Sequence, residues 1–174
     1  MRRIMLLSII VLTILLDQGT KTVVRATMRD SEPRRYAGGL LTLLYAENPG
    51  AFLSLGAQLP RAIRRVVFDG VVGIGLLVAL WILVTGRMSG RSDDIALALV
   101  IGGGVGNLID RALFHGVVTD FLYLSAGPLH TGVFNVADMA ITGGVLWLAL
   151  ASLLPKRRLE AGEPAGKDAG AANG

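Results

Sequence analysis

The sequence predicts an all-α membrane protein with four transmembrane helices. Of its 174 residues, 52% are hydrophobic, and the mean hydropathy is +0.59. This average comes from four apolar runs, each close to the roughly 20 residues that cross a hydrocarbon layer about 30 Å thick. The predicted spans are residues 4–24, 66–84, 95–114 and 133–154. They occupy nearly half of the chain, so we expect residues 1–155 to form one membrane domain without a separate soluble domain.

The first span must extend beyond its uncharged beginning. Met1-Arg2-Arg3 followed by Ile4–Leu16 resembles the basic end and apolar run of a signal peptide. The uncharged part is only about 20 Å long as a helix, so the helix must continue through Asp17 and Lys21 to cross the membrane. These two charges have i,i+4 spacing with the acid first, which is the favourable order. We therefore expect an uncleaved first span.

Two of the connecting segments have strand-like sequence. Leu40–Tyr45 is a short apolar run that precedes the turn signal Asn48-Pro49-Gly50, and Val117–Tyr123 has a similar composition in the last loop. The charged segment Met28–Gly39 is predicted to be a surface loop. A helix at the membrane interface is expected to begin near Pro60, because proline suits the first helical turn.

Basic residues lie beside the predicted spans, where they suit lipid headgroups. The net charge is only +4, so we do not expect nucleic acid as a partner. Seven basic residues fall on each side of the membrane, so the positive-inside rule alone does not decide the orientation. The flanks Arg2-Arg3 and Lys156-Arg157-Arg158 favour cytoplasmic termini. Residues 156–174 become Gly/Ala-rich and are predicted to be a disordered cytoplasmic tail.

The polar residues inside the predicted spans fall at one end of the bundle. An ionised group near the membrane centre costs about 2.5–3.5 kcal/mol on insertion scales, so each one requires a reason. These residues are Asp17, Lys21, Asp69, Asn107, Asp110, Arg111, Asn135 and Asp138. Because successive spans alternate in direction, the ends that carry them meet at the same membrane face. The pattern predicts one polar site near that face.

Two helical motifs and one loop acid make up this site. Helical spacing places the amide, carboxylate and guanidinium of Asn107-Leu108-Ile109-Asp110-Arg111 on one face, and Asn135-Val136-Ala137-Asp138 repeats the amide-plus-acid spacing. Asp120 lies in the loop between them. Such groups often only join helices by hydrogen bonds. Two close carboxylates can also share a proton and act as base and acid, which activates water without a metal. The convergence of several acids at one depth favours the second interpretation.

Other catalytic chemistries find little support in the sequence. There is no cysteine and no His-Glu-x-x-His motif, and both histidines, His115 and His130, lie in a predicted loop. Ser54 has no evident His or Lys partner. The run Gly102–Gly106 lacks the Lys of a phosphate-binding loop and lies within a span, so we interpret it as a close helix contact. We expect neither a metal nor a cofactor.

Several motifs, in order along the chain, resemble the signature of the lipoprotein signal peptidase (signal peptidase II) family of intramembrane aspartyl peptidases. They are Asp17-Gln18-Gly19-Thr20-Lys21, Asn48-Pro49-Gly50-Ala51-Phe52, Gly103 to Arg111 with Val118-Thr119-Asp120-Phe121, and Phe134-Asn135-Val136-Ala137-Asp138. The resemblance extends from about Met1 to Leu154. Pro49 and the Arg-rich first loop are minor departures from the family pattern.

The resemblance implies that Asp120 and Asp138 are a catalytic dyad. Asn48, Asn107, Asp110, Arg111, Asn135, Asp17 and Lys21 are implied as substrate-binding or supporting residues. The implied reaction removes the signal peptide from prolipoproteins just before a diacylglyceryl-modified cysteine, near the periplasmic face of the bacterial inner membrane. The implied fold adds a small periplasmic β-structured cradle to the four spans. The expected enzyme is a monomer among membrane lipids, with both termini in the cytoplasm.

Two other classes of protein are compatible with some of these features. A transporter or ion-pathway subunit would use Asp110 and Asp138 as proton carriers, with acids spread through the membrane depth and broken helices in matching halves. Here the acids fall at one end, and no internal repeat is evident. A non-catalytic membrane scaffold would leave the paired acids unexplained. The sequence does not indicate which lipoproteins are preferred or which acid holds the proton at rest.

Overall fold

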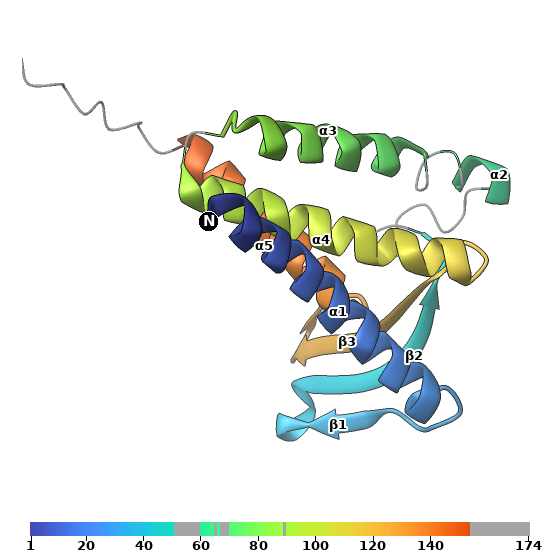
Figure 1. The fold of residues 1–174 in the computed structure, drawn as a ribbon. Helices are drawn as coiled ribbons and strands as arrows, with labels where there is room; N and C mark the ends of the chain where they lie inside the picture. Colours follow the sequence, from blue (N-terminus) through green and yellow to red (C-terminus); the bar gives the residue numbers. More distant parts are fainter. Residues whose placement is uncertain (51–59, 65, 67–69, 89, 154–174) are drawn as a thin grey trace, which may run out of the picture.

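The computed structural model describes residues 1–50, 60–64, 66, 70–88 and 90–153. This part of the chain is mostly helical and carries a small antiparallel sheet at one end (Figure 1). The elements in chain order are α1 (Arg2–Met28), β1 (Arg34–Tyr36), the 3₁₀ helix η1 (Ala37–Gly39), β2 (Leu41–Asn48), α2 (Arg61–Arg64), α3 (Val72–Thr85), α4 (Arg91–Leu113), β3 (Val118–Ala126), β4 (Leu129–His130) and α5 (Val136–Leu153).

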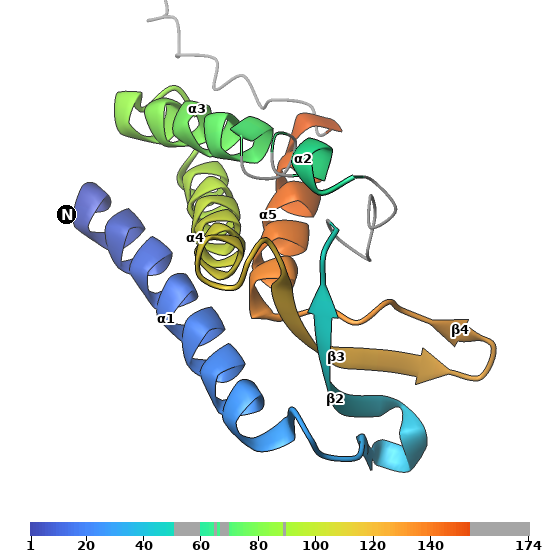
Figure 2. The ribbon, with the colours of Figure 1, turned by 90° about the vertical axis from the view of Figure 1, so that its right-hand side faces the viewer.

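Helix α4 lies at the centre of the bundle and packs against α1, α3 and α5 (Figure 2). In its most apolar stretch 56% of the residues are buried, compared with 22% for α1 and 17% for α5. Small residues permit this central position, since Ala96, Ala98 and the glycines from Gly102 to Gly106 let neighbouring backbones approach closely. The polar end of α4 is therefore surrounded by other elements.

Within the described residues, three helices, α1, α4 and α5, are long and apolar enough to cross a membrane, whereas α3 is apolar but has only 14 residues. Large apolar side chains are exposed on the outer faces of the bundle. Examples are Leu12 and Leu15 on α1, Leu77 on α3, and Leu146 and Leu150 on α5. An apolar exterior around a partly polar interior suits a protein whose solvent is lipid.

The sheet lies where α1 and α4 end and α5 begins (Figure 2). Its strands follow the order β1-β2-β3-β4, and all neighbours are antiparallel. In β2 and β3, Ala46 is paired with Asp120, and the register shifts between Leu43 and Ala46. Phe121 packs on Val24 and Met28 of α1. This contact anchors the beginning of β3 to the helical bundle.

The predicted elements agree with the observed ones in part. The predicted span 66–84 overlaps α3, which begins only at Val72. The spans 4–24, 95–114 and 133–154 correspond to α1, α4 and α5, and both strand-like segments form strands. The prediction that 28–39 is only a surface loop is wrong, because Arg34–Tyr36 pairs with β2 as an edge strand. Asp69 and the predicted tail 156–174 lie outside the described residues.

Candidate active site

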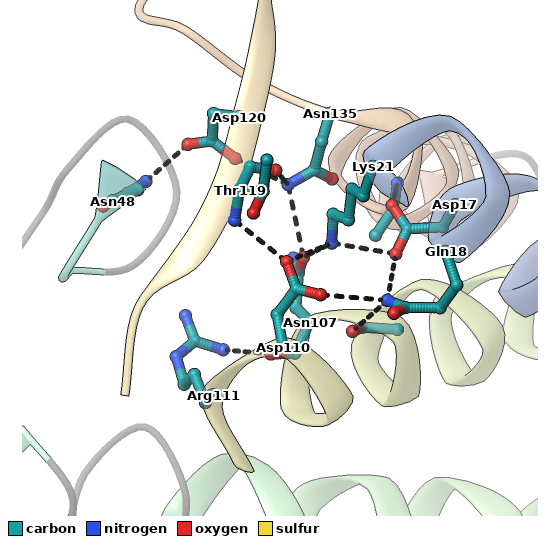
Figure 3. Close-up of polar contacts among 12 residues, drawn as sticks. Asp17, Gln18, Lys21, Asn48, Asn107, Asp110, Arg111, Thr119, Asp120 and Asn135 are labelled. Carbon is teal, nitrogen blue, oxygen red and sulfur yellow. Dashed lines mark hydrogen bonds and ion pairs between the residues drawn. The ribbon is translucent and has the colours of Figure 1, made fainter. Parts of the chain in front are cut away.

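Two buried charges of α1 lie at the centre of a polar cluster (Figure 3). Lys21 follows Asp17 by one helical turn; both side chains are fully buried, and Lys21 Nζ lies 2.8 Å from Asp17 Oδ2. Lys21 Nζ also donates to Asn107 Oδ1 at 2.9 Å and lies 3.4 Å from Asp110 Oδ2. Asp17 Oδ1 accepts the backbone N–H of Ala137 at 3.0 Å, at the beginning of α5, where the helix dipole favours a negative charge. These contacts join α1 to α4 and α5.

Asp110 connects α4 to the strand that carries Asp120. Its side chain is fully buried, and Oδ2 accepts the backbone N–H of Thr119 at 2.9 Å. The other oxygen, Oδ1, accepts Gln18 Nε2 at 3.2 Å and lies 3.4 Å from Arg25 Nη1. Arg25 Nη1 also donates to Thr119 Oγ1 at 2.9 Å. Since Thr119 directly precedes Asp120, these contacts fix the beginning of β3.

The spacing Asn-x-x-Asp at the beginning of α5 forms a reciprocal cap. Asn135 Oδ1 accepts the backbone N–H of Asp138 at 2.9 Å, and Asp138 Oδ2 accepts the backbone N–H of Asn135 at 3.3 Å. A residue just before a helix and the third residue within it often satisfy each other's backbone donors in this way. Asn107 Nδ2 donates to Asp138 Oδ1 at 2.9 Å. Both oxygens of Asp138 are therefore held by named donors.

Asp120 is held by two amide side chains from different elements. Asn135 Nδ2 donates to Asp120 Oδ1 at 2.6 Å, and Asn48 Nδ2 donates to Oδ2 at 2.8 Å. Asn48 is itself oriented, because its Oδ1 accepts the backbone N–H of Gly50 at 2.9 Å. Asp120 is 1% exposed and Asp138 6% exposed. Asn135 thus connects two nearly buried carboxyl groups.

Burial raises the pKa of Asp120 from 3.8 to about 7, because it disfavours the charged form. The hydrogen bonds from Asn48 and Asn135 and the charge of Lys21 oppose this rise, whereas the negative charge of Asp138 adds to it. A carboxyl group with a pKa near neutrality can take up or release a proton under ordinary conditions. Asp120 therefore has the property expected of a group that transfers protons.

The polar cluster contains one more acid than cations within the part of the chain that the structure describes. Its four carboxyl groups belong to Asp17, Asp110, Asp120 and Asp138, and its three cations are Lys21, Arg25 and Arg111. One proton retained on the acids makes the charges equal, which is favourable in a buried site. Since burial raises the pKa of Asp120 to about 7, this acid can hold a proton near neutral pH.

The structure brings together the nine residues that the family resemblance implies as catalytic, substrate-binding or supporting. They are Asp17, Lys21, Asn48, Asn107, Asp110, Arg111, Asp120, Asn135 and Asp138. Arg111 joins through the loop after β2, because its Nη2 donates to the backbone oxygen of Gly50 at 3.0 Å. Among the described residues, no group of three His, Cys, Asp or Glu side chains is arranged to hold a metal ion.

Three residues of the cluster were missed by the sequence analysis. Arg25 continues the i,i+4 series of Asp17 and Lys21, so helical spacing alone could have included it. Gln18 and Thr119 lie within the quoted motifs, but neither was given a role at the site. Gln18 Nε2 donates to the backbone oxygen of Gly106 at 3.0 Å and to the carboxyl groups of Asp17 and Asp110. The contacts with Gly106 and Asp110 depend on how α1 packs on α4, which the sequence does not predict.

A mainly apolar groove of about 570 Å³ adjoins Asp138. It extends along α5 and under the β3–β4 hairpin. Its lining residues are Leu124, His130, Thr131, Phe134, Asp138, Met139, Thr142, Gly143 and Leu146. A larger cavity, about 740 Å³, is lined by Arg91 and Asp94 at the beginning of α4, the opposite end of that helix from Asp110. Of these two cavities within the described residues, the groove beside Asp138 lies at the acid pair.

Comparisons with known proteins find similarity to one family. The profile of the family described as signal peptidase (SPase) II matches residues 9–154. A lipoprotein signal peptidase of Syntrophus aciditrophicus is 39% identical over 80% of this chain and 86% of the relative. A lipoprotein signal peptidase of Moorella thermoacetica is 40% identical over 87% of this chain and 93% of the relative. A solved structure described as a bacterial membrane enzyme has the same fold, with a TM-score of 0.78, 24% identity, and coverage of 91% of this chain and 93% of the other.

The family profile and these relatives each cover most of the chain, and the acids and amides of the polar cluster lie within residues 9–154. The chain therefore belongs to the signal peptidase II family and is an aspartic-type peptidase.

Proposed function

We propose that the protein removes the signal peptide from diacylglyceryl-modified prolipoproteins and cuts just before the lipidated cysteine. Asp120 and Asp138 act as the dyad that activates water. The observation that carries the proposal is the set of hydrogen bonds made by Asn135. This residue binds both Asp120 of β3 and Asp138 of α5, whose carboxyl groups are nearly buried. The substrate assignment is supported by relatives that are named lipoprotein signal peptidases.

In this mechanism the pair begins with one proton. The ionised carboxylate takes a proton from a water molecule, and the hydroxide attacks the carbonyl carbon of the scissile peptide while the protonated partner donates to the carbonyl oxygen. The tetrahedral intermediate then collapses: the C–N bond breaks, the leaving nitrogen receives a proton, and the carbonyl re-forms by returning a proton to the other acid. The pair ends with one proton, as it began.

The remaining site residues hold this pair in place and prepare the substrate path. The amides of Asn48, Asn107 and Asn135 each donate to a dyad carboxyl group. Asp17, Asp110 and Lys21 join α1 and α4 to β3 and α5, the elements that carry the dyad, and Arg111 holds the turn at Gly50. The apolar groove beside Asp138 is suited to the apolar part of a membrane-bound substrate.

We further propose that α3 is part of a fourth span, residues 66–84. Alone, its 14 residues measure about 21 Å, less than the hydrocarbon thickness. Its packing on α4, through Leu76 against Gly104, and its exposed Leu77 and Trp81 suit a helix between protein and lipid. Four spans put both termini on the same side of the membrane. We propose that this side is the cytoplasm, with the dyad and the sheet near the periplasmic face of the inner membrane. We expect the enzyme to act as a monomer among membrane lipids.

The direct test is cleavage of a lipidated prolipoprotein by the purified protein and its Asp120→Asn and Asp138→Asn variants. Asn keeps the shape of Asp but cannot take up the proton, so each variant should lose at least about 100-fold in rate. The double variant should be little worse, because groups that act as one unit are non-additive. Mass spectrometry of the product should find the lipidated cysteine at the new N-terminus.

The matched control is Asp30→Asn, which removes an exposed carboxylate just after α1 and should leave the rate unchanged. Chelators should also have no effect, because the proposed reaction uses no metal. Substantial cleavage by a folded Asp120→Asn or Asp138→Asn protein would remove the dyad from the mechanism. Loss of activity on chelation would contradict the metal-free chemistry.

A further inference from the structure

Thr119, the residue before Asp120, is bound on every polar group that it carries. Its backbone N–H donates to Asp110 Oδ2 at 2.9 Å, and its backbone oxygen accepts Asn135 Nδ2 at 3.4 Å. Its hydroxyl oxygen accepts Arg25 Nη1 at 2.9 Å, and the residue is only 3% exposed. The backbone contacts are visible in Figure 3, on the strand that carries Asp120. The Thr119 peptide is therefore held by hydrogen bonds from α1, from α4 and from the residue that precedes α5.

Arg25 is well placed to make the contact from α1. The guanidinium lies 4.3 Å from the centre of the Phe114 ring, and its Nη1 lies 3.4 Å from Asp110 Oδ1. Only 19% of the side chain is exposed, so the contacts are shielded from water. A planar guanidinium that stacks on a ring and pairs with a carboxylate has little freedom to move. Arg25 therefore presents a fixed donor to Thr119.

Successive side chains of a strand point to opposite faces, so Thr119 and Asp120 cannot face the same partners. Asp120 turns toward Asn48 and Asn135, whereas the hydroxyl of Thr119 turns toward α1. If the Thr119 side chain loses its contact and shifts, the backbone that it shares with Asp120 shifts too, and the Asp120 carboxyl group moves with it. Displacements near 1 Å in a catalytic group cost about 100-fold in rate, so this connection is large enough to matter.

We propose that Arg25 and Thr119 are a positioning pair, which fixes the peptide before Asp120 and thereby holds its carboxyl group in the geometry for hydrolysis. The proposal rests on the function assigned to Asp120 above. Neither residue touches the reacting atoms. The pair acts in addition to the Asp110 hydrogen bond, which remains when the pair is lost, so its removal weakens the reaction without abolishing it.

The test compares Thr119→Val, Thr119→Ser and Arg25→Gln in the lipidated prolipoprotein assay. Thr119→Val keeps the shape but removes the hydroxyl acceptor, and it should lower kcat about 10- to 100-fold with KM changed less than about twofold. Thr119→Ser keeps the hydroxyl and should restore most of the rate. Arg25→Gln should lower kcat at least as much as Thr119→Val, because it also removes the ion pair with Asp110. The double variant should be no worse than Arg25→Gln alone, because the contact with Thr119 is already absent there.

The control is Arg29→Gln, one turn further along α1. Arg29 is 65% exposed and pairs with Glu47, not with Thr119, so this variant removes the same charge and should leave kcat unchanged. Three results would each overturn the proposal. They are a wild-type kcat in folded Thr119→Val, a raised KM with a normal kcat, and additive losses of kcat in the double variant. If Arg25→Gln fails to fold, the two Thr119 variants decide.

A second readout separates positioning from mere loss of stability. If Asp120 moves away from Asn48 and Asn135, it loses donors that favour its ionised form, so the alkaline limb of the rate profile should move to higher pH. The groups that face Asp120 and contribute to this limb are Asp138 and Lys21. An unmoved limb in a slowed Thr119→Val enzyme indicates a structural role only. Full activity of Asp120→Asn would instead refute the proposed function itself.

Discussion

The side-chain amide of Asn135 has two functions. Its oxygen caps the beginning of α5, and its nitrogen binds Asp120 of the acid pair. Its Oδ1 must accept the N–H of Asp138 to begin the helix, and its Nδ2 must donate to Asp120. Aspartate could form the cap but would place an acceptor where Asp120 requires a donor. Serine could also form the cap but would lack a second group to reach Asp120. An asparagine here therefore satisfies local helix formation and the site together.

The pH dependence of cleavage should respond to Asn48. Asp120 has a pKa of about 7, so the proton of the pair is lost as the pH rises through this value, and kcat/KM should fall on the alkaline side. The amide of Asn48 favours the ionised carboxylate, so Asn48→Ala should raise the pKa of Asp120 further. The alkaline limb should then move to higher pH, as measured by kcat/KM across the pH range.

Glu47→Gln is the matched control for this profile. Glu47 is the neighbour of Asn48 in β2, and its side chain contacts Arg29 and Tyr45, away from Asp120. Its removal should leave the alkaline limb in place. A limb that stays fixed in Asn48→Ala would show that Asp120 does not set the alkaline fall in rate.

At the residue scale, the sequence could predict the site members that follow helical spacing or belong to a motif. Asp17 and Lys21 are one turn apart, and the Asn-x-x-Asp pattern marks the beginning of α5. Spacing cannot predict which partner a buried group selects across the bundle. The contact of Thr119 with Arg25 joins residues 94 positions apart, and it depends on how α1 crosses the beginning of β3.

The glycines of α4 fit different neighbours according to the face on which they lie. A Cβ on Gly102 would lie 2.8 Å from Thr13 Cβ, and one on Gly106 would lie 2.6 Å from Asp17 Oδ2, so both fit against α1. A Cβ on Gly103 would lie 2.5 Å from the backbone oxygen of Ala137. The interpretation of Gly102–Gly106 as a close helix contact is therefore confirmed, and the contact at Gly106 brings Asp17 to α4.

The crossing of α4 and α5 should be sensitive to a single methyl group at Gly144. A Cβ there would lie 2.5 Å from the backbone oxygen of Ala96, which cannot move without separating the helices. Gly144→Ala should destabilise the protein by about 1–3 kcal/mol. The neighbouring Gly143→Ala has no atom within 4 Å of its new Cβ and should leave stability unchanged or slightly raised. Thermal unfolding in detergent distinguishes the two; equal melting temperatures would contradict the packing argument.

At the element scale, sequence predicts helices better than the edges of the sheet. The long apolar runs identify α1, α4 and α5 because burial in lipid requires such runs whatever the partners are. The strand β1 has no apolar alternation, and its Arg34 and Arg35 are exposed. It exists because the β2 edge offers unpaired backbone groups, which any extended segment can satisfy. Because this pairing uses backbone groups only, the pattern of side chains in the sequence does not predict it.

Across the whole molecule, polarity is reversed relative to a water-soluble domain. Leucines lie on the outer surface, while Lys21, Asp17 and Asp110 are fully buried among the helices. Each buried charge has an opposite charge or several donors, which is required because an uncompensated ion in such surroundings is strongly unfavourable. The buried cluster around Lys21 and Asp110 lies at the end that carries the sheet, because Asp110 binds the backbone of Thr119 in β3. That arrangement leads to a prediction about how the chain lies in the membrane.

The end of the bundle that carries the sheet should face the periplasm. The chain contains no cysteine, so Ser31→Cys, just after α1, and Ser92→Cys, in the first turn of α4, each provide a single thiol on an exposed residue. The two sites lie at opposite ends of the bundle, because α1 ends and α4 begins at different ends (Figure 1). A membrane-impermeant maleimide should label Ser31→Cys in intact inner-membrane spheroplasts and Ser92→Cys only after permeabilisation. Labelling of Ser92→Cys alone in intact spheroplasts would place the acids on the cytoplasmic side and overturn the orientation.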